Sequence, residues 1–262
     1  MKLMLKKLAS AALDFCLPRA CAGCQQTWTL SEQGCWCPSC REALAWIGSP
    51  RCPGCGIPFL DSPDSDDHLC GECLKGAFDF DVARSAVLYA GMARKRIHQL
   101  KFGGKLHWVP ALAALLAESV KPGDAVNRVD MIVPVPLHQQ RLRQRGFNQA
   151  GLIAREFGRA CSIPVRFGVL IRHRATLPQT RLGRRERLDN VRGAFMIARR
   201  EAVRGRSVLL LDDVFTTGTT LSECAKVLKR AGAQTVHALT VARVVPDVAM
   251  AGLDDAEPTL RA

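Results

Sequence analysis

In the stretch Val208-Leu-Leu-Leu-Asp-Asp-Val-Phe-Thr-Thr-Gly-Thr-Thr220, an apolar run is followed by two acidic residues and a turn of small hydroxyl side chains. The run from 208 to 211 has β character and no polar alternation, which indicates a strand buried on both faces of a parallel sheet. Asp212 and Asp213 mark the carboxyl end of this strand. In such sheets, ligands bind just beyond the carboxyl ends of the strands. The stretch therefore predicts an α/β fold and the edge of the sheet that carries a site.

The turn after the strand has the chemistry of an anion site. Four threonines surround one flexible glycine, and a helix-like stretch from 221 to 230 follows. Backbone N–H groups at a helix N-terminus and short hydroxyls bind phosphate, and a carboxylate pair accepts hydrogen bonds from sugar hydroxyls. An ordinary strand and a threonine-capped helix are the alternative, but a cap needs one hydroxyl and no acidic pair. We therefore expect a phosphorylated ribose to be held by Asp212, Asp213, Thr216, Thr217, Gly218, Thr219 and Thr220.

Strand-like and helix-like segments alternate around this stretch. An apolar stretch at 82–89 comes first, and a βα rhythm begins at residue 129. The rhythm favours a parallel sheet with helices on both faces. We expect strands at 129–133, 165–170, 194–197, 207–211 and 235–242, and helices at 92–100, 109–120, 148–160 and 219–231.

Two arginine-bearing segments lie between these elements. The segment 134–149 follows the first strand of the rhythm, and its two prolines indicate a stiff turn. We expect a loop there, with phosphate oxygens bound by Arg141, Arg143 and Arg145, because a guanidinium binds phosphate through two parallel hydrogen bonds. The segment 174–190 is polar, basic and without helical periodicity, so it reads as a long loop over the site or as a solvated charged surface. Its candidate phosphate ligands are Arg174 and Arg187.

The net charge of +13 is unevenly placed along the chain. Residues 1–80 contain seven basic and nine acidic residues, so the positive excess lies beyond them. The segment 139–206 alone has seventeen arginines, four acidic residues and no lysine. A coding preference explains arginine in place of lysine but not an excess of positive charge. The pattern therefore favours a polyanionic partner such as nucleic acid or pyrophosphate.

Four Cys-x-x-Cys pairs lie before residue 74. Each pair can place two thiolates on one tetrahedral metal ion, so two pairs complete a four-cysteine zinc site. Twelve residues separate the first two pairs and fourteen separate the last two, which is typical of zinc ribbons. A disulfide framework would suit a secreted protein, but the chain shows no credible secretory signal. The expected zinc ligands are Cys21, Cys24, Cys37, Cys40, Cys52, Cys55, Cys70 and Cys73.

The pairing of these motifs has two solutions. Sequential pairing gives two small ribbons, and an interleaved cross-brace uses the same residues with different partners. The segment 46–50 reads as a short link between two similar units, which favours sequential pairing. Four thiolates leave no open position for water, so we expect one or two structural rather than catalytic zinc ions. Cys16 and Cys35 are left over as substitute ligands.

The amino-terminal segment 1–18 has three lysines and an apolar stripe. It predicts a short amphipathic helix that packs on the protein or lies on a membrane surface. Its apolar part is short and interrupted by Asp14, which argues against a secretory signal, and no apolar run approaches the roughly 20 residues that span a bilayer. We therefore expect a cytoplasmic protein. The expected divisions are 1–18, a double zinc ribbon at 19–78, an α/β domain at 79–245 and a mobile tail at 246–262.

Taken together, these segments resemble the ComF/GntX family. The resemblance runs from about residue 21 to 241 and is carried by four features: the cysteine-rich start, Pro134-Val-Pro-Leu with Arg145-Gly-Phe-Asn-Gln, the pattern from Thr176 to Phe195, and the Asp-Asp with Thr-Gly-Thr-Thr stretch. It implies the fold of a type I phosphoribosyltransferase. It further implies that phosphoribosyl pyrophosphate (PRPP) binds with Mg²⁺, the acidic pair holding the ribose 2′ and 3′ hydroxyls, residues 216–220 the 5′-phosphate and the 134–149 loop the pyrophosphate.

The same resemblance implies a role in natural competence. Proteins of this family are associated with the handling of single-stranded DNA that enters the cell, so DNA and a competence helicase or other DNA-uptake proteins are expected partners. An active phosphoribosyltransferase with an unidentified nitrogen acceptor is one alternative, although no segment plainly supplies a hood for a base. A purely structural adaptor is the other.

Overall fold

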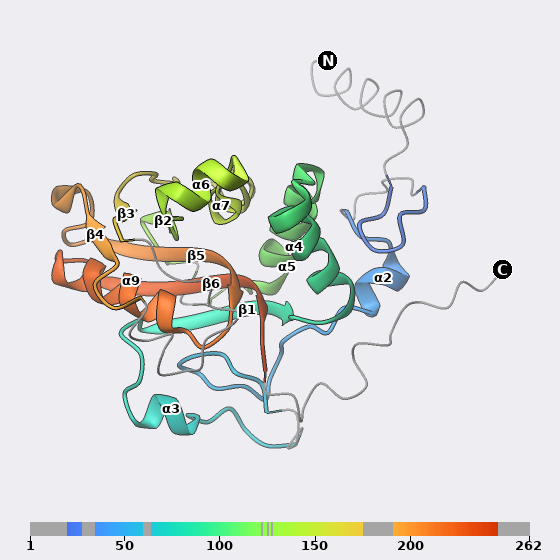
Figure 1. The fold of residues 1–262 in the computed structure, drawn as a ribbon. Helices are drawn as coiled ribbons and strands as arrows, with labels where there is room; N and C mark the ends of the chain where they lie inside the picture. Colours follow the sequence, from blue (N-terminus) through green and yellow to red (C-terminus); the bar gives the residue numbers. More distant parts are fainter. Residues whose placement is uncertain are drawn as a thin grey trace, which may run out of the picture.

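The computed structural model describes residues 20–27, 35–59, 64–121, 123–124, 126, 128–174 and 191–245. Its centre is a four-stranded, all-parallel sheet with the strand order β1-β6-β5-β2 (Figure 1). Because parallel strands need crossover connections, helices lie between them in the chain and cover the sheet. The strands are β1 (Val82–Leu88), β2 (Met131–Pro134), β5 (Ser207–Phe215) and β6 (Thr235–Arg243).

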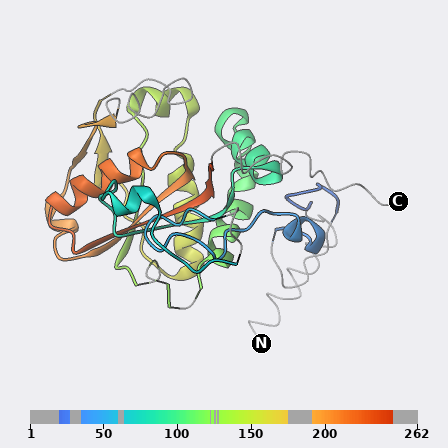
Figure 2. The ribbon, with the colours of Figure 1, turned by 90° about the horizontal axis from the view of Figure 1, so that it is seen from below.

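Alternate residues of β5 enter two separate cores. Leu209 and Leu211 belong to one buried cluster, and Val208 and Leu210 belong to another. The first core contains buried side chains of α4, α5 and α7, and the second contains those of α9. Figure 2 shows the ribbon of α9 from below, together with that of α3. The parallel, doubly covered sheet that the apolar run predicts is therefore present. The helices are α4 (Gly91–Gly103), α5 (Val109–Ser119), α7 (Gln149–Cys161) and α9 (Thr219–Arg230), with a 3₁₀ turn, η1 (Leu106–Trp108), before α5.

The cysteine-rich region contributes to both cores. Its first half contains the short helix α2 (Pro38–Glu42) and packs on α5, where Trp36 Nε1 donates a hydrogen bond of 3.0 Å to the Ala111 carbonyl. Its second half contains α3 (Gly71–Leu74), and Cys52 and Cys55 are buried in the core of α9. The two halves therefore support different faces of the sheet.

Two of the strands expected in the parallel sheet, 165–170 and 194–197, are not part of it. β3 (Leu170–Arg172) and β4 (Phe195–Ile197) pair with each other in an antiparallel sheet of their own. Ile171 and Met196 face each other and are exposed, so each strand buries one side only, as antiparallel strands do. The sheet position is taken instead by β1, which the sequence marks only as an apolar stretch. Val165 makes an isolated parallel bridge to Ile132.

Two further differences concern the site. β5 continues to Phe215, so the acidic pair lies inside the strand and not after it. The segment expected as an arginine loop contains the helix α6 (Gln139–Arg145), whose first turn is capped by the His138 side chain and which ends at Gly146 with φ of +80°. Strand and helix geometry thus decide where the polar side chains point.

Candidate functional site

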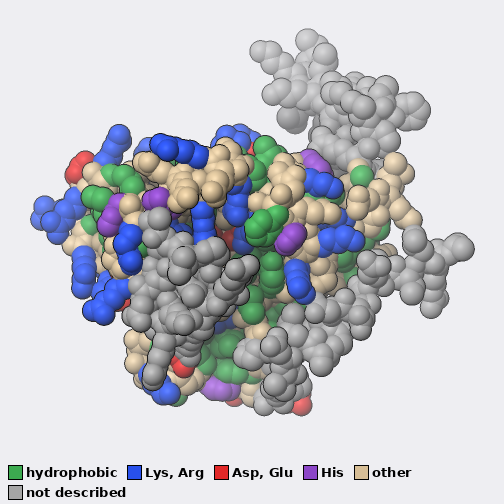
Figure 3. Space-filling model, in the orientation of Figure 1, with side chains coloured by type: hydrophobic (Ala, Val, Ile, Leu, Met, Phe, Trp, Pro, Cys, Tyr) green, Lys and Arg blue, Asp and Glu red, His purple; other side chains and the backbone are tan. Residues whose placement is uncertain are grey.

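A cavity of about 740 Å³ opens at the carboxyl edge of the sheet. It is bounded by the end of β5, the start of α9, α6 and the end of α4. Figure 3 shows that Lys and Arg side chains gather on the upper and left parts of the face seen there. The size of the cavity lies within the range of small-molecule sites in proteins.

The turn before α9 forms one wall of the cavity. Gly218 is buried, has φ of +78° and is the N-cap of α9. Thr216, Gly218 and Thr220 line the cavity, whereas the hydroxyls of Thr217 and Thr219 lie 3.0 Å apart and bond each other. The helix α9 begins directly at this turn. Its first backbone N–H groups therefore lie at this wall of the cavity, where they favour the binding of an anion.

The acidic pair forms the floor. Asp213 is 3% exposed, and its Oδ2 lies 2.9 Å from Lys101 Nζ, while Asp212 Oδ1 accepts a hydrogen bond of 2.9 Å from the Asp213 backbone N–H. Burial and the neighbouring charge of Asp213 raise the pKa of Asp212 to about 8, although Lys101 acts in the opposite direction. At neutral pH the protonated form of Asp212 is therefore favoured.

The helix α6 separates the three arginines that the sequence groups together. Arg141 and Arg145 are four residues apart, lie on one face of the helix and line the cavity. Arg143 is exposed and is not among the cavity-lining residues. Arg145 Nη1 donates a hydrogen bond of 2.6 Å to Gln149 Oε1, which fixes its direction. The expectation of a three-arginine loop is therefore wrong in its geometry.

Two cations of the cavity were not predicted. Lys101 stands near the end of α4 and Arg172 belongs to β3, where it is 6% exposed and lies 5.4 Å from the Phe195 ring centroid. The sequence signal at Lys101 is weak, because it is only a lysine just before a Gly-Gly helix stop. The signal at Arg172 is that it occupies a buried position in a strand of alternating burial. With Arg141 and Arg145 they place four cations around the two acidic residues among the described lining residues.

The remaining predicted arginines are not part of this cavity as described. Arg174 is exposed, and its Nη2 donates a hydrogen bond of 2.5 Å to the Arg192 carbonyl. Arg187 and the rest of the segment 175–190 lie outside the described residues.

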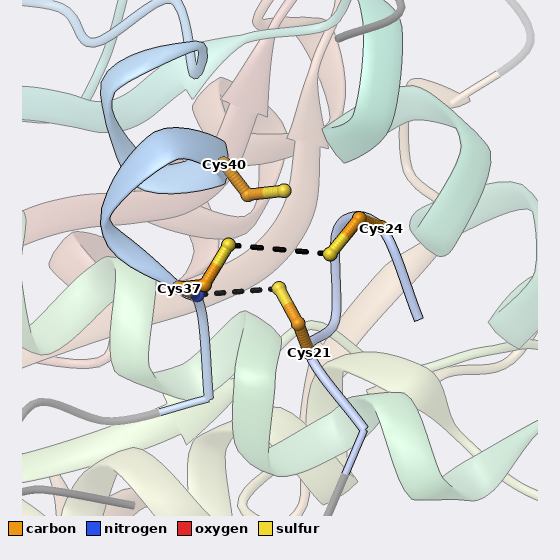
Figure 4. A group of neighbouring side chains, drawn as sticks. All are labelled: Cys21, Cys24, Cys37 and Cys40. Carbon is orange, nitrogen blue, oxygen red and sulfur yellow. Dashed lines mark hydrogen bonds between the residues drawn. The ribbon is translucent and has the colours of Figure 1, made fainter. Parts of the chain in front are cut away.

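The first cysteine cluster joins Cys21, Cys24, Cys37 and Cys40 (Figure 4), whose sulfur atoms all lie within 4.8 Å of one another. Cys21 Sγ accepts hydrogen bonds from the backbone N–H groups of Cys37 at 3.2 Å and Gly23 at 3.3 Å. Burial alone would raise the pKa of Cys21, but these backbone N–H groups outweigh it and lower the pKa to about 7. A ready thiolate among three further thiols suits a tetrahedral zinc ion.

The second cluster joins Cys52, Cys55, Cys70 and Cys73 with the same spread. Cys52 Sγ accepts a hydrogen bond of 3.4 Å from the Cys70 backbone N–H, and backbone hydrogen bonds again outweigh burial and lower the pKa of Cys52 to about 7. The grouping is sequential in both clusters. Cys35 belongs to neither cluster among the described residues, and Cys16 lies outside them. The two clusters support structural zinc.

Among the helices that the structure describes, none is long and apolar enough to cross a membrane. The expected amphipathic segment 1–18 and the tail 246–262 lie outside the described residues.

Family models match two parts of the chain. The double zinc ribbon domain matches residues 12–74, and the phosphoribosyl transferase domain matches residues 142–250. With the fold, these matches define the class: a phosphoribosyltransferase-type α/β protein with a double zinc ribbon at its amino-terminal side.

Relatives narrow the class to a family. DNA utilization protein YhgH of Escherichia coli O157:H7 is 34% identical over 87% of this chain and 99% of its own. Competence protein F of Haemophilus influenzae is 29% identical over 85% and 96%, and competence protein ComFC of Bacillus subtilis is 29% identical over 79% and 83%. The chain belongs to the ComF/GntX family, as its motifs indicate. Among solved structures, glutamine PRPP amidotransferase of B. subtilis is 24% identical over 57% of this chain and 26% of its own, with a TM-score of 0.31.

Proposed function

We propose that this protein binds PRPP in the cavity at the edge of the sheet. The 5′-phosphate lies against the turn at 216–220 and the N-terminus of α9, and the ribose hydroxyls donate to Asp212 and Asp213. The pyrophosphate meets the cations across the cavity, and Mg²⁺ bound with it would neutralise part of its charge. Arg141 and Arg145 are its nearest candidates on α6, and Lys101 and Arg172 complete the ring of positive charge.

One observation carries this proposal. An acidic pair, a helix-initiating threonine turn and four cations line a single cavity, although they come from five different elements of the chain. A phosphorylated ribose that also bears a pyrophosphate presents hydroxyls between two anionic ends. The cavity presents carboxyl groups between an anion-binding turn and a cationic wall, so the two arrangements are complementary.

The proposed biological role is the handling of single-stranded DNA during uptake. The relatives are named for DNA utilization and competence, and the arginine-rich part of this chain carries the positive charge that tracks a phosphate backbone. The zinc ribbons support the sheet and offer a surface for partner proteins of DNA uptake.

The test is calorimetric titration of the whole chain with PRPP in the presence of Mg²⁺. We expect saturable binding at one site. Binding should be lost when Asp212→Asn and Asp213→Asn are combined, because the side-chain NH₂ groups of Asn are donors and cannot accept hydrogen bonds from the ribose hydroxyls. Equal binding by the double variant, or none by the native chain, would overturn the proposal. Circular dichroism of the double variant checks that the fold is kept.

A second candidate function is phosphoribosyl transfer to a nitrogen acceptor. Tyr89, Phe102 and Phe147 line the same cavity, and Phe102 is 66% exposed, so a planar acceptor has aromatic surface to stack on. In this reaction the acceptor nitrogen bonds to the anomeric carbon, pyrophosphate leaves with the electrons of the broken C–O bond, and the acceptor proton passes to solvent. Pyrophosphate release that depends on an added base or amine tests it; release that is the same without an acceptor counts against it.

A further inference from the structure

Each cysteine cluster is held by one buried arginine from the α/β domain. Arg96 of α4 is 1% exposed and donates to the Ala22 carbonyl and, at 2.6 Å, to the Gly23 carbonyl. Arg243, the last residue of β6, is 4% exposed and donates from Nη1 to the Cys55 carbonyl at 2.7 Å and from Nη2 to Cys55 Sγ at 3.6 Å. The two clusters are alike in this respect, but the two arginines have different neighbours.

Arg243 connects the second cluster to the end of β5. Its guanidinium carbon lies 3.9 Å from the centroid of the Phe215 ring, whereas Arg96 lies 4.3 Å from the Trp108 ring. Phe215 is also the strand partner of Arg243 and is directly followed by Thr216, the first residue of the turn at 216–220, which we call the phosphate turn. One guanidinium therefore contacts a cysteine ligand candidate on one side and the residue before the turn on the other.

Gly218 of the phosphate turn packs tightly against the Phe215 ring. A Cβ placed on Gly218 would lie 2.6 Å from Phe215 Cζ and 2.7 Å from Phe78 Cε1. Phe78 follows the second ribbon in the chain and packs edge-on against Phe215, with the ring centroids 6.1 Å apart. A shift of either ring therefore moves the backbone of Gly218.

A second connection runs from the same segment to the first turn of α9. The Asp79 backbone N–H donates to Ser222 Oγ at 3.0 Å, and Ser222 Oγ donates to Asp79 Oδ2 at 2.9 Å. Ser222 is also bonded to the turn, since its backbone N–H donates to the carbonyl of Gly218, the N-cap of α9, at 2.8 Å. The second ribbon thus reaches the turn through both the rings and the helix.

We propose that the second cysteine cluster is a structural part of the phosphate site, and that Arg243 is the positioning residue that joins them. Cys55 orients the guanidinium, and the guanidinium holds the Phe215 ring under Gly218; a zinc ion bound by the four cysteines would fix the position of Cys55. The first cluster, joined to α4 through Arg96, has no such contact with the turn among the described residues. The inference rests on the proposed phosphate role of the turn for its affinity measurement only.

Substitution of Arg243 tests the connection, with Arg96 as the matched control. Arg243→Met keeps an unbranched apolar stem over Phe215 but removes both guanidinium donors to Cys55. We expect ribose 5-phosphate affinity to fall roughly 3- to 30-fold, the range of coupling measured along packed networks. The backbone amide resonances of Gly218 and Thr219 should shift, and zinc content by atomic spectroscopy should stay at two per chain, one for each cluster. Arg96→Met should leave the Gly218 resonance in place.

The two readouts separate this inference from the proposed function. A native chain that binds ribose 5-phosphate, with unchanged affinity and an unchanged Gly218 resonance in Arg243→Met, overturns the inference and leaves the function standing. A native chain that binds neither PRPP nor ribose 5-phosphate refutes the function, and the Gly218 resonance still decides the inference. If Arg243→Met does not fold, zinc is removed stepwise from the native chain. The Gly218 resonance should then shift together with the resonances of Cys55 and Cys70. A Gly218 shift that accompanies only the resonances of Cys21 and Cys37 would contradict the inference.

Discussion

At the scale of single residues, Asp212 is the group whose state depends most on its surroundings. It lies next to a second carboxyl on a strand that is buried on both faces, and Lys101 and the Asp213 backbone N–H offset part of the cost of its charge. An ionised carboxyl accepts hydrogen bonds from ribose hydroxyls at both oxygens, yet burial and the neighbouring carboxyl favour the protonated form. Ligand binding and proton release are therefore linked at this residue.

This linkage predicts a pH dependence of ribose 5-phosphate binding. The pKa of Asp212 is raised to about 8, so the carboxylate form is the minority below that pH and affinity rises as the pH increases. For one such group, affinity should increase about tenfold between pH 7 and pH 9. Calorimetry across that range checks it, and Asp212→Asn should flatten the profile. Affinity that is constant or falls over this range would contradict the prediction.

Gly218 allows a second prediction at this scale, because it combines a left-handed backbone with a tight contact. Gly218→Ala adds a Cβ at φ of +78° and 2.6 Å from Phe215. We expect a loss of about 2–5 kcal/mol in the free energy of unfolding, the sum of backbone strain and overpacking, and loss of ribose 5-phosphate binding. Urea unfolding measures the first quantity.

The matched control is Gly205→Ala. Gly205 has φ of +68°, but a Cβ there meets nothing within 4 Å, so only the strain of about 1–2 kcal/mol should remain. Equal losses at the two positions would show that the contact with Phe215 costs nothing.

At the scale of elements, the short helix α6 decides which arginines serve the cavity. Arg141 and Arg145 share a face because they are four residues apart, and Arg143 projects elsewhere. Burial lowers the pKa of Arg145, while Asp213 raises it, and a guanidinium remains charged at any physiological pH. The charge on that face is therefore permanent.

This geometry predicts unequal effects of two otherwise similar substitutions. Arg145→Ala should weaken PRPP binding by about 1.5–3 kcal/mol, or roughly 10- to 160-fold, the value of a charged hydrogen bond, and should affect ribose 5-phosphate far less. Arg143→Ala should change PRPP affinity less than about twofold. Titration of both variants with both ligands provides the comparison. Equal losses of PRPP affinity in the two variants would show that the pyrophosphate does not bind at the α6 side of the cavity.

Prediction from sequence succeeded where local signals are dense. The run at 208–220 marks a buried strand, an acidic pair and a helix start, and all three lie where expected except that the strand includes the pair. It failed where partners are distant in the chain. Lys101 pairs with Asp213 across more than a hundred residues. The expected parallel strand at 165–170 meets the sheet only at the isolated bridge of Val165 to Ile132, and β3 pairs with β4 instead. Such contacts depend on the tertiary fold and leave no local pattern.

At the scale of the whole molecule, positive charge extends well beyond the cavity. Residues 139–206 carry seventeen arginines, and many of those described are exposed, as Figure 3 shows on one face. A ligand the size of PRPP neutralises only the few that line the cavity. The others remain available to a longer polyanion.

We therefore predict that single-stranded DNA binds with a strong dependence on salt. For about six phosphate contacts, the logarithm of the affinity should fall with the logarithm of the salt concentration with a slope of about −4. Fluorescence anisotropy of a labelled oligonucleotide, measured from low to physiological salt, gives this slope. A slope near zero would show that the basic surface does not contact the phosphate backbone.

The order of the strands also has a consequence in time. β1 pairs with β6, and their register joins Val82 to His237, so at a synthesis rate of about 5–20 residues per second the partner of β1 emerges roughly 10–30 s after it. In the folded chain the other edge of β1 is covered, since the Ile47 backbone N–H donates to the Ala86 carbonyl and the Leu88 N–H to the Ala45 carbonyl. We therefore expect the cysteine-rich region, which is synthesised first, to cover this edge of β1 before β6 is made.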